Sequence, residues 1–306
     1  MLRAALLTAS RNRTVRRIVE TAPVSRDVVR RFVAGTSVAD AVVVTSALAA
    51  DGLRISLDHL GEDTTEAGHA DATTKAYVTL LQQLAAHELA SVAEVSVKLS
   101  AVGQALDVSM ARDNAATICT AAAEAGTTVT LDMEDHATTD STLSTLHELR
   151  AEFPWVGAVI QAYLHRSVDD CRELATSGSR VRLCKGAYKE PASVAYQSRL
   201  DVDRSYVRCL RVLIEGDGYP MVATHDPRLI AIAERLITES GRAHDSYEFQ
   251  MLYGIRPKEQ RRIAATGARM RVYVPYGDEW YGYLMRRLAE RPANVAFFMR
   301  ALATKG

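Results

Sequence analysis

Two adjacent arginines stand near the C-terminus, in the stretch "YGYLMRRLAERPAN" at residues 281–294. At 3.6 residues per helical turn, Tyr283, Arg286, Arg287 and Glu290 fall on one stripe of a helix. Two guanidiniums beside a tyrosine can clamp a carboxylate or a phosphate, because each guanidinium presents a planar fork of donors. The alternative is a solvated helix face whose Arg–Glu pairs contribute about 0.2–0.5 kcal/mol each. The helix pattern alone leaves both interpretations open.

A lysine and an aspartate in strand-like segments are further candidates for chemistry. Lys98 lies among apolar neighbours in "SVKLS", in a chain with only six lysines. It could bind an anion, form a Schiff base as in aldolases, or extend past the strand end into solvent. Asp132 in "TLDMED" is available for a site, because Thr138, Thr139 and Asp140 can cap the helix that follows.

The segment "VRLCKGAY" carries two more cations. Strand alternation places Arg182 and Cys184 on one face, while Lys185 emerges at the strand end. Gly186 and Ala187 lack bulk, so a flat ring or a phosphate could approach the backbone closely there. This combination is typical of a site for an anionic ligand.

Thr224 and His225 in "ATHD" end another apolar run, where the histidine is either a structural residue or a ligand contact. The acidic and histidine residues of 58–71, "DHLGEDTTEAGHAD", match no known metal-ligand spacing, and we expect no metal. Glu62 in this segment is a candidate counter-ion for one of the paired arginines.

These residues need a scaffold that brings strand ends together. After about fifty residues of helical pattern, eight β-rich runs alternate with segments rich in Ala, Leu, Glu and Arg, which predicts a closed (βα)8 barrel of the TIM type over 51–306 with an N-terminal helical arm over 1–50. No GxGxxG or P-loop motif supports an open sheet. Enzymes on this fold carry their chemistry at the carboxyl ends of the strands. The predicted strands are 53–58, 93–100, 128–134, 155–164, 180–186, 219–225, 247–252 and 270–276.

Composition excludes several classes of function. The 306 residues carry 37 basic and 37 acidic side chains, so nothing resembles a nucleic-acid footprint. No apolar run is long enough for a transmembrane helix, and the N-terminal run is too short for a signal peptide. The four cysteines show no metal-ligand spacing and indicate reduced thiols in a cytosolic setting. We expect a cytoplasmic protein, with peripheral contact at the inner face of the membrane left open.

Nine motifs follow one another along the chain: "LDHLGED", "SVKLS", "LDMED", "QAYLHR", "RLCKGAY", "ATHD", "YEFQMLYG", "VYVPYG" and "YLMRRLAERPAN". In this order they resemble the flavin-dependent proline dehydrogenase family, and a chain ending at Gly306 resembles its monofunctional bacterial type. The resemblance implies non-covalently bound FAD and oxidation of L-proline to Δ1-pyrroline-5-carboxylate by hydride transfer to flavin N5, the first step of proline degradation to glutamate. The eighth helix is then expected over the barrel mouth.

The resemblance also implies a role for each residue. Arg182 would lie near flavin N5, and Asp132 would order the pocket by pairing with Lys98 or its neighbours. Glu62 would pair with Arg286 as a gate. The substrate carboxylate would be held by Lys98, Arg286 and Arg287, and the ring would be enclosed by Tyr273, Tyr283 and Leu252. FAD would be contacted by Met133, Gln161, Arg182, Lys185, Gly186, Ala187, Thr224 and His225, with Glu290 bracing the arginines or the cofactor.

One position departs from the long bifunctional members, which carry an aromatic residue after "KGAY" that can cover the adenine. Here the residue is Lys189, so the adenine end of FAD is expected to be held differently. The chain has no aldehyde dehydrogenase segment, so its product would pass to a separate pyrroline-5-carboxylate dehydrogenase. A membrane quinone is the expected electron acceptor. Two alternatives remain, a Schiff-base aldolase or lyase on the same barrel and a non-catalytic anion-binding barrel.

Overall fold

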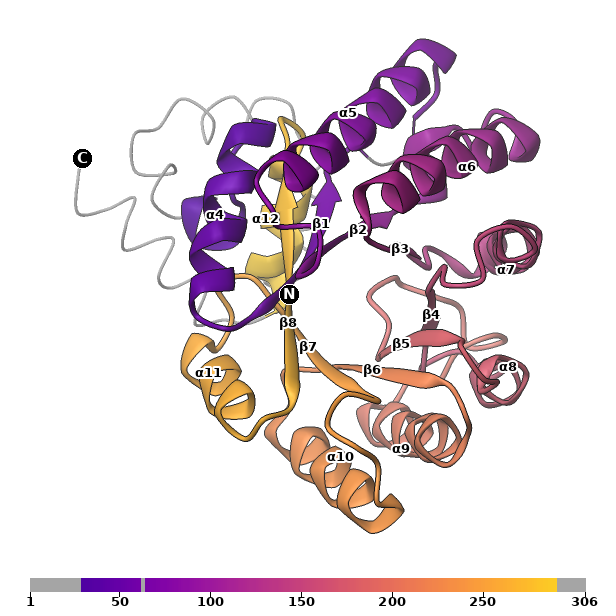
Figure 1. The fold of residues 1–306 in the computed structure, drawn as a ribbon. Helices are drawn as coiled ribbons and strands as arrows, with labels where there is room; N and C mark the ends of the chain where they lie inside the picture. The colour runs from indigo at the N-terminus through magenta and orange to yellow at the C-terminus, as the bar shows by residue number, and fades with distance from the viewer. Residues whose placement is uncertain (1–28, 62–63, 291–306) are drawn as a thin grey trace, which may run out of the picture.

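The computed structural model describes residues 29–61 and 64–290, with the side chains of 286–290 outside the description. Eight parallel strands form one sheet in the order β3-β2-β1-β8-β7-β6-β5-β4 (Figure 1). This arrangement confirms the predicted barrel. The strands are β1 Arg54–His59, β2 Ala93–Val97, β3 Val129–Leu131, β4 Ala158–Gln161, β5 Arg180–Cys184, β6 Tyr219–Ala223, β7 Glu248–Leu252 and β8 Arg269–Tyr276.

A glycine closes the ring between β3 and β4. Gly157 forms a parallel bridge with Thr130; its N–H donates to the Val129 carbonyl at 2.8 Å, and its carbonyl accepts from Leu131 N–H at 2.9 Å. A Cβ added at Gly157 would lie 2.7 Å from Thr130 Oγ1. The two strands therefore approach closely because this position carries no side chain.

A helix follows every strand, and local capping explains several of their starts. Ser198 accepts a hydrogen bond from Asp201 N–H before α9, and Asp226 caps α10, which begins with a proline as N-terminal turns favour. The helices are α4 Val38–Ala50, α5 Ala67–Ala86, α6 Val108–Ala125, α7 Thr139–Arg150, α8 Ser167–Leu174, α9 Arg199–Glu215, α10 Pro227–Ser240, α11 Pro257–Ala265 and α12 Trp280–Glu290, with 3-10 turns η1 Leu99–Val102 and η2 His136–Thr138.

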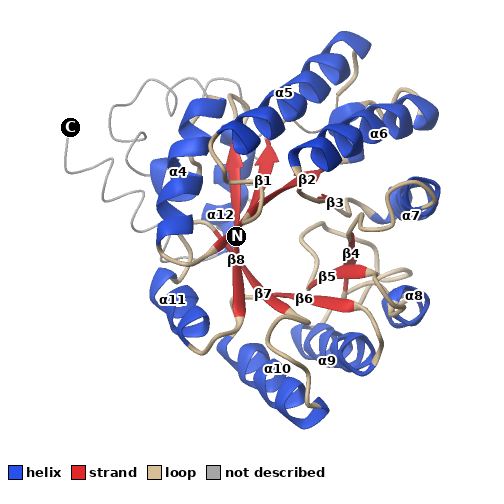
Figure 2. Ribbon diagram, viewed as in Figure 1, coloured by secondary structure: helices blue, strands red, loops and turns tan. Residues whose placement is uncertain are grey.

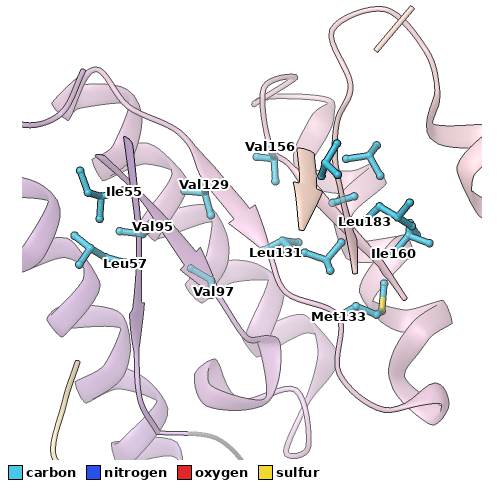
Figure 3. Packing of buried hydrophobic residues seen from close by; sticks show 14 of the residues in the cluster. Ile55, Leu57, Val95, Val97, Val129, Leu131, Met133, Val156, Ile160 and Leu183 are labelled. Atoms are coloured by element: carbon cyan, nitrogen blue, oxygen red, sulfur yellow. The ribbon is translucent and has the colours of Figure 1, made fainter. Parts of the chain in front are cut away.

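Alternation along the strands separates an apolar layer from a polar one. Ile55, Leu57, Val95 and Val97 are fully buried in the cluster that joins the strands to the surrounding helices (Figure 3). The residues between and beyond them in β1 and β2 point to the opposite side, into the barrel. These inward residues are polar and are also buried: Ser56, Asp58, Glu94, Ser96 and, directly after β2, Lys98.

Helix α4 takes the place in the outer ring that the eighth helix of a (βα)8 barrel usually holds. It packs against β1, β8 and α5, and Figures 1 and 2 show it on the outside of the barrel beside α11. Helix α12, the eighth helix after a strand, instead buries Tyr281, Leu284 and Met285 against Phe32 and Leu60, and Leu60 directly follows β1. The predicted position of this helix at the carboxyl end of the barrel is thereby confirmed.

Several predicted strands are longer than the observed ones. The run 93–100 ends as a strand at Val97, where η1 begins with Leu99 and the Lys98 side chain is directed to Asp58. The run 155–164 contributes only Ala158–Gln161. Apolar patterning continues through these turns because the residues stay buried after the sheet hydrogen bonds end.

Candidate active site

The carboxyl ends of β1, β2, β3, β5 and β8 bring a compact polar cluster together inside the barrel mouth. Its centre is the Asp132 carboxylate, which accepts hydrogen bonds from Arg182 Nη1 at 2.6 Å, Ser96 Oγ at 2.7 Å and the Tyr273 hydroxyl at 2.6 Å. Lys98 Nζ lies 3.6 Å from the same carboxylate. The sequence prediction that Asp132 is available for a site is therefore consistent with the structure.

The cap assignment near Asp132 was partly wrong. The Asp135 side chain, rather than Thr138, Thr139 or Asp140, accepts hydrogen bonds from the Ala137 and Thr138 N–H groups. Thr138 is the residue before α7 but makes no side-chain cap hydrogen bond.

The two terminal nitrogens of Arg182, Nη1 and Nη2, make hydrogen bonds that hold the guanidinium in place, whereas its Nε donor makes none among the described residues. Nη1 donates to Ser96 Oγ at 2.9 Å as well as to Asp132, and Nη2 donates to Ser56 Oγ at 3.2 Å. Its guanidinium carbon lies 5.2 Å from the centre of the Tyr273 ring. Nε is buried without a hydrogen-bond partner among the described residues. An acceptor atom from a bound molecule could satisfy this donor.

Lys98 is an ion-paired ammonium. Nζ donates to Asp58 Oδ1 at 2.6 Å and to the Tyr273 hydroxyl at 3.3 Å. Asp58 is 1% exposed, so it is a desolvated carboxylate that favours a cation beside it. Sequence reasoning noted Asp58 at a strand end but gave it no role.

Among the described residues, the four charges at the centre of the cluster balance. Lys98 and Arg182 supply two positive charges, and Asp58 and Asp132 supply two negative ones, all within one set of ion pairs. Burial alone would raise the pKa of Asp132, but Arg182, Lys98 and the hydrogen bonds to it together lower that pKa below the usual value. An anionic substrate would therefore need additional cations.

A second ionic layer lies deeper in the barrel, and sequence reasoning missed it. Glu94 pairs with Arg180 and lies 3.6 Å from Arg182 Nη2, while Glu248 accepts from Arg271 Nε at 2.7 Å. Each of these residues is two positions from another inward polar residue on its strand. Period-two polarity in otherwise apolar strands was the signal available in the sequence.

The carboxylates of this ionic layer and of the central cluster should resist protonation. Burial raises the pKa of Glu94, Glu248 and Asp132, but their arginine partners outweigh burial and leave each pKa lower than usual. Stability from these groups is therefore full above the unfolded-state pKa of about 4 and is lost as pH falls through the folded pKa values. We expect about 1.4 kcal/mol of lost stability per group for each pH unit in that window.

Carbon-13 NMR of side-chain carboxyl carbons tests this expectation. At about pH 3, below the ordinary carboxyl pKa, the Glu94 signal should keep its ionised chemical shift while signals of exposed carboxylates have moved. Its assignment comes from the spectrum of Glu94→Gln. Titration of the Glu94 signal together with the exposed carboxylates would contradict the ionic layer.

Lys185 is engaged by two aspartates at the start of the next units. Nζ lies 2.5 Å from Asp203 and 3.1 Å from Asp226, and Arg228 also contacts both carboxylates. Arg199 Nη2 also lies 3.6 Å from Asp226, so three cations face two carboxylates here. Sequence reasoning identified the lysine but not these partners, which lie 18 and 41 residues away along the chain.

Both the backbone conformation and the packing at position 186 require a glycine. Its φ is +110°, and an added Cβ would lie 2.3 Å from Cδ1 of Tyr163. The close approach predicted for a ligand at this backbone is therefore made by the Tyr163 ring in this structure. The Tyr163 hydroxyl donates to Glu190 at 3.3 Å, which ties the loop after β4 to the loop after β5.

Gly186→Ala is expected to lower the free energy of unfolding by at least about 2 kcal/mol, because backbone strain and overpacking each cost about 1–3 kcal/mol. Gly178→Ala is the matched control: φ is +77° there, but nothing lies within 4 Å of the added Cβ. Urea denaturation of both variants separates the two costs. Equal destabilisation would contradict the Tyr163 contact.

His225 has a defined structural hydrogen bond. Its Nε2 accepts from Leu252 N–H at 2.9 Å, which places the proton of the neutral ring on Nδ1. Thr224 Oγ1 accepts from Asp226 N–H at 3.1 Å and so shapes the start of α10. The structural interpretation of His225 is supported, and a further contact to a ligand stays a prediction.

The carboxyl ends of β3, β4 and β5 and the loops that follow them place three more predicted residues beside the mouth. Gln161 Nε2 donates to the Glu134 backbone carbonyl at 2.6 Å, and Glu134 accepts from Ser100 Oγ at 2.6 Å. Met133, between Asp132 and Glu134, is buried in the main core near Ile160 (Figure 3). Ala187 follows Gly186 in the loop after β5 and is exposed.

The paired arginines lie on the helix that packs at this mouth. Tyr283 on α12 is 5% exposed, and the backbone of Arg286, Arg287 and Glu290 belongs to the same helix. The side chains of these last three residues, and Glu62 as a whole, lie outside the described residues. Their predicted roles as clamp, brace and gate stay predictions.

Known proteins resemble the chain over most or all of its length. The family model described as proline dehydrogenase matches residues 41–300. "Proline dehydrogenase 1" of Bacillus subtilis (strain 168) is 39% identical over 305 residues, covering 100% of each chain, and "Proline dehydrogenase" of Deinococcus radiodurans is 42% identical over 277 residues, covering 89% of each.

A solved structure agrees with these matches. Proline utilization A from Bdellovibrio bacteriovorus, inactivated by N-propargylglycine, superposes with a TM-score of 0.78 at 27% identity. The superposition covers 86% of this chain and 32% of that one, so the chain spans about a third of that protein. Among the described helices none is both long and apolar enough to cross a membrane.

Proposed function

The chain belongs to the proline dehydrogenase family, and we propose that it oxidises L-proline to Δ1-pyrroline-5-carboxylate with non-covalently bound FAD. One observation carries this proposal beyond the family. The buried cluster of Asp132, Arg182, Tyr273 and Lys98 lies inside the carboxyl mouth of a parallel barrel, the end at which such barrels place their chemistry.

The residues present fit a flavin at the centre of this mouth. Arg182 Nε is a buried donor without a partner among the described residues, and a flavin ring offers acceptor nitrogen and oxygen atoms that could complete its hydrogen bonding. A permanent cation there also favours an electron-rich ring. Tyr273 and Ser96 fix the guanidinium against Asp132, so this charge is preorganised.

A bound flavin would supply the oxidising power, as the acceptor of a hydride from the ring carbon beside the proline nitrogen. The protein positions the substrate and supplies charge. Tyr273, Tyr283 and Leu252 are proposed to enclose the pyrrolidine ring, and Lys98, Arg286 and Arg287 to hold the carboxylate. A bidentate contact fixes which carbon faces the flavin.

Further contacts to FAD follow from the predicted residue set. Lys185 would contact the cofactor while its ammonium keeps the ion pairs with Asp203 and Asp226. We propose a membrane quinone as electron acceptor, peripheral contact of a cytoplasmic protein with the membrane, and transient contact with a pyrroline-5-carboxylate dehydrogenase. The other proposed FAD contacts are Met133, Gln161, Gly186, Ala187, Thr224, His225 and Glu290.

The aldolase alternative conflicts with the state of Lys98. Schiff-base formation needs a neutral amine, whereas Nζ lies between the carboxylates of Asp58 and Asp132. Incubation of the purified protein with L-proline and an artificial electron-accepting dye should yield the cyclic imine, detected by mass spectrometry. Absence of this product, together with borohydride trapping of a carbonyl compound on Lys98, would favour the aldolase.

A further inference from the structure

A cavity lies at the amino-terminal mouth of the barrel, opposite the candidate active site. Its volume is about 300 Å³, at the lower end of the range for small-molecule sites. Arg54, Arg180, Tyr219 and Arg269 line it from the first residues of β1, β5, β6 and β8. The cavity thus lies at the strand starts, whereas the candidate active site lies at the strand ends, and Glu94 in the lining approaches Arg182 Nη2 of that site to 3.6 Å.

The cavity contains more positive than negative charge. Four guanidiniums line it, those of Arg54, Arg180, Arg269 and Arg271, against the single lining carboxylate of Glu94. Glu248, which pairs with Arg271, adds a second carboxylate directly behind the lining. Four positive charges against two negative ones leave an excess of two.

The excess belongs to Arg54 and Arg269, because neither pairs with a carboxylate among the residues that the structure describes. Arg54 Nη1 donates to the Ser91 carbonyl at 3.3 Å, and Arg269 Nη1 donates to the Asp245 backbone carbonyl at 2.7 Å and to the Tyr219 hydroxyl at 3.4 Å. Both are partly exposed, so a ligand can reach them.

Other features of this mouth also favour an added anion. Partial burial lowers the pKa of Arg54, and the nearby charges of Arg271 and Arg269 lower it further. Arg180 Nη1 is buried and has no hydrogen-bond partner among the described residues. Cations that repel one another at a mouth with spare donors are stabilised by a bound oxyanion.

We propose that this cavity binds a small dianion, a phosphate or a dicarboxylate, through the guanidiniums of Arg54 and Arg269. Guanidinium forks match both phosphate and carboxylate oxygens. A dianion is expected because it neutralises the excess charge counted above. The site is distinct from the proline site and does not depend on the proposed reaction.

Isothermal titration of the FAD-loaded protein with inorganic phosphate, and separately with succinate, tests the proposal at constant ionic strength adjusted with sodium chloride. At least one dianion should give saturable heat, and the better of the two identifies the preferred oxyanion class. Saturating L-proline should leave this binding unchanged. Displacement by proline would place the anion in the substrate site and overturn the proposal.

Variants locate the binding. Arg54→Gln combined with Arg269→Gln should weaken dianion binding at least tenfold. If the double variant fails to fold, Arg54→Gln alone should also weaken dianion binding. The matched control removes the same charge from the outer helices through Arg211→Gln and Arg235→Gln, since each of these arginines already pairs with a glutamate four residues on. Equal weakening in the control, or no saturable binding of either dianion to the native protein, would overturn the site.

Discussion

Replacing Arg182 with lysine is expected to lower the limiting rate of flavin reduction at saturating proline by about 10²-fold, the usual effect of losing one preorganised donor. A lysine keeps the charge but cannot reach Ser56, Ser96 and Asp132 together, as the guanidinium does. Because this charge acts on the electron-accepting group as electrons arrive, the loss falls on the chemical step more than on affinity.

Anaerobic stopped-flow spectroscopy measures this limiting rate directly. Arg242→Lys is a suitable control, because Arg242 is another multiply bonded arginine, whose donors reach only backbone carbonyls such as Ile214 and Gly218. The control should react like the native protein. A normal limiting rate in Arg182→Lys, with a raised half-saturation for proline, would assign Arg182 to substrate binding instead.

The largest effect on proline affinity is expected at the arginine pair. Lys98 and Arg182 are already balanced by Asp58 and Asp132, so the mouth offers little net attraction to a carboxylate. We expect the added cations to come from α12, which packs at this end of the barrel through Tyr281 and Leu284. Arg286→Met or Arg287→Met should each cost about 2–4 kcal/mol of apparent proline binding.

A double variant and a lysine variant distinguish a carboxylate clamp from a solvated helix face. The two losses should not add in the double variant, because both arginines share one carboxylate. Arg286→Lys should also bind weakly, since an ammonium reproduces neither the fork nor the proposed Glu62 pair. Arg261→Met, on the exposed side of α11, serves as control. Unchanged melting with lost affinity supports the clamp, whereas near-native kinetics in both single variants would reject it.

The fold was largely predictable because each strand leaves a local pattern. The segment Pro227–Ser240, for example, carries its own cap and apolar stripe and forms the helix α10. The position of α4 in the outer ring depends on contacts with β1 and β8, which no local pattern encodes. The motif resemblance, rather than periodicity, predicted the displaced eighth helix.

The site was predictable as a set of residues but not as a network of charges. Strand-end position identified Lys98, Asp132 and Arg182, which the structure brings together. It did not reveal that Asp58 neutralises Lys98, because the two residues are 40 positions apart. Which carboxylate pairs with which cation depends on which strands are neighbours, and the closed barrel determines that.

The visible spectrum of the purified protein, recorded before and after anaerobic addition of L-proline, shows whether the protein is a flavoprotein that oxidises proline. We expect an oxidised flavin absorbance that bleaches when proline is added and returns when an electron acceptor is admitted. A protein that carries flavin but keeps its absorbance under saturating proline, or one that binds no flavin even when reconstituted with FAD, would contradict this expectation.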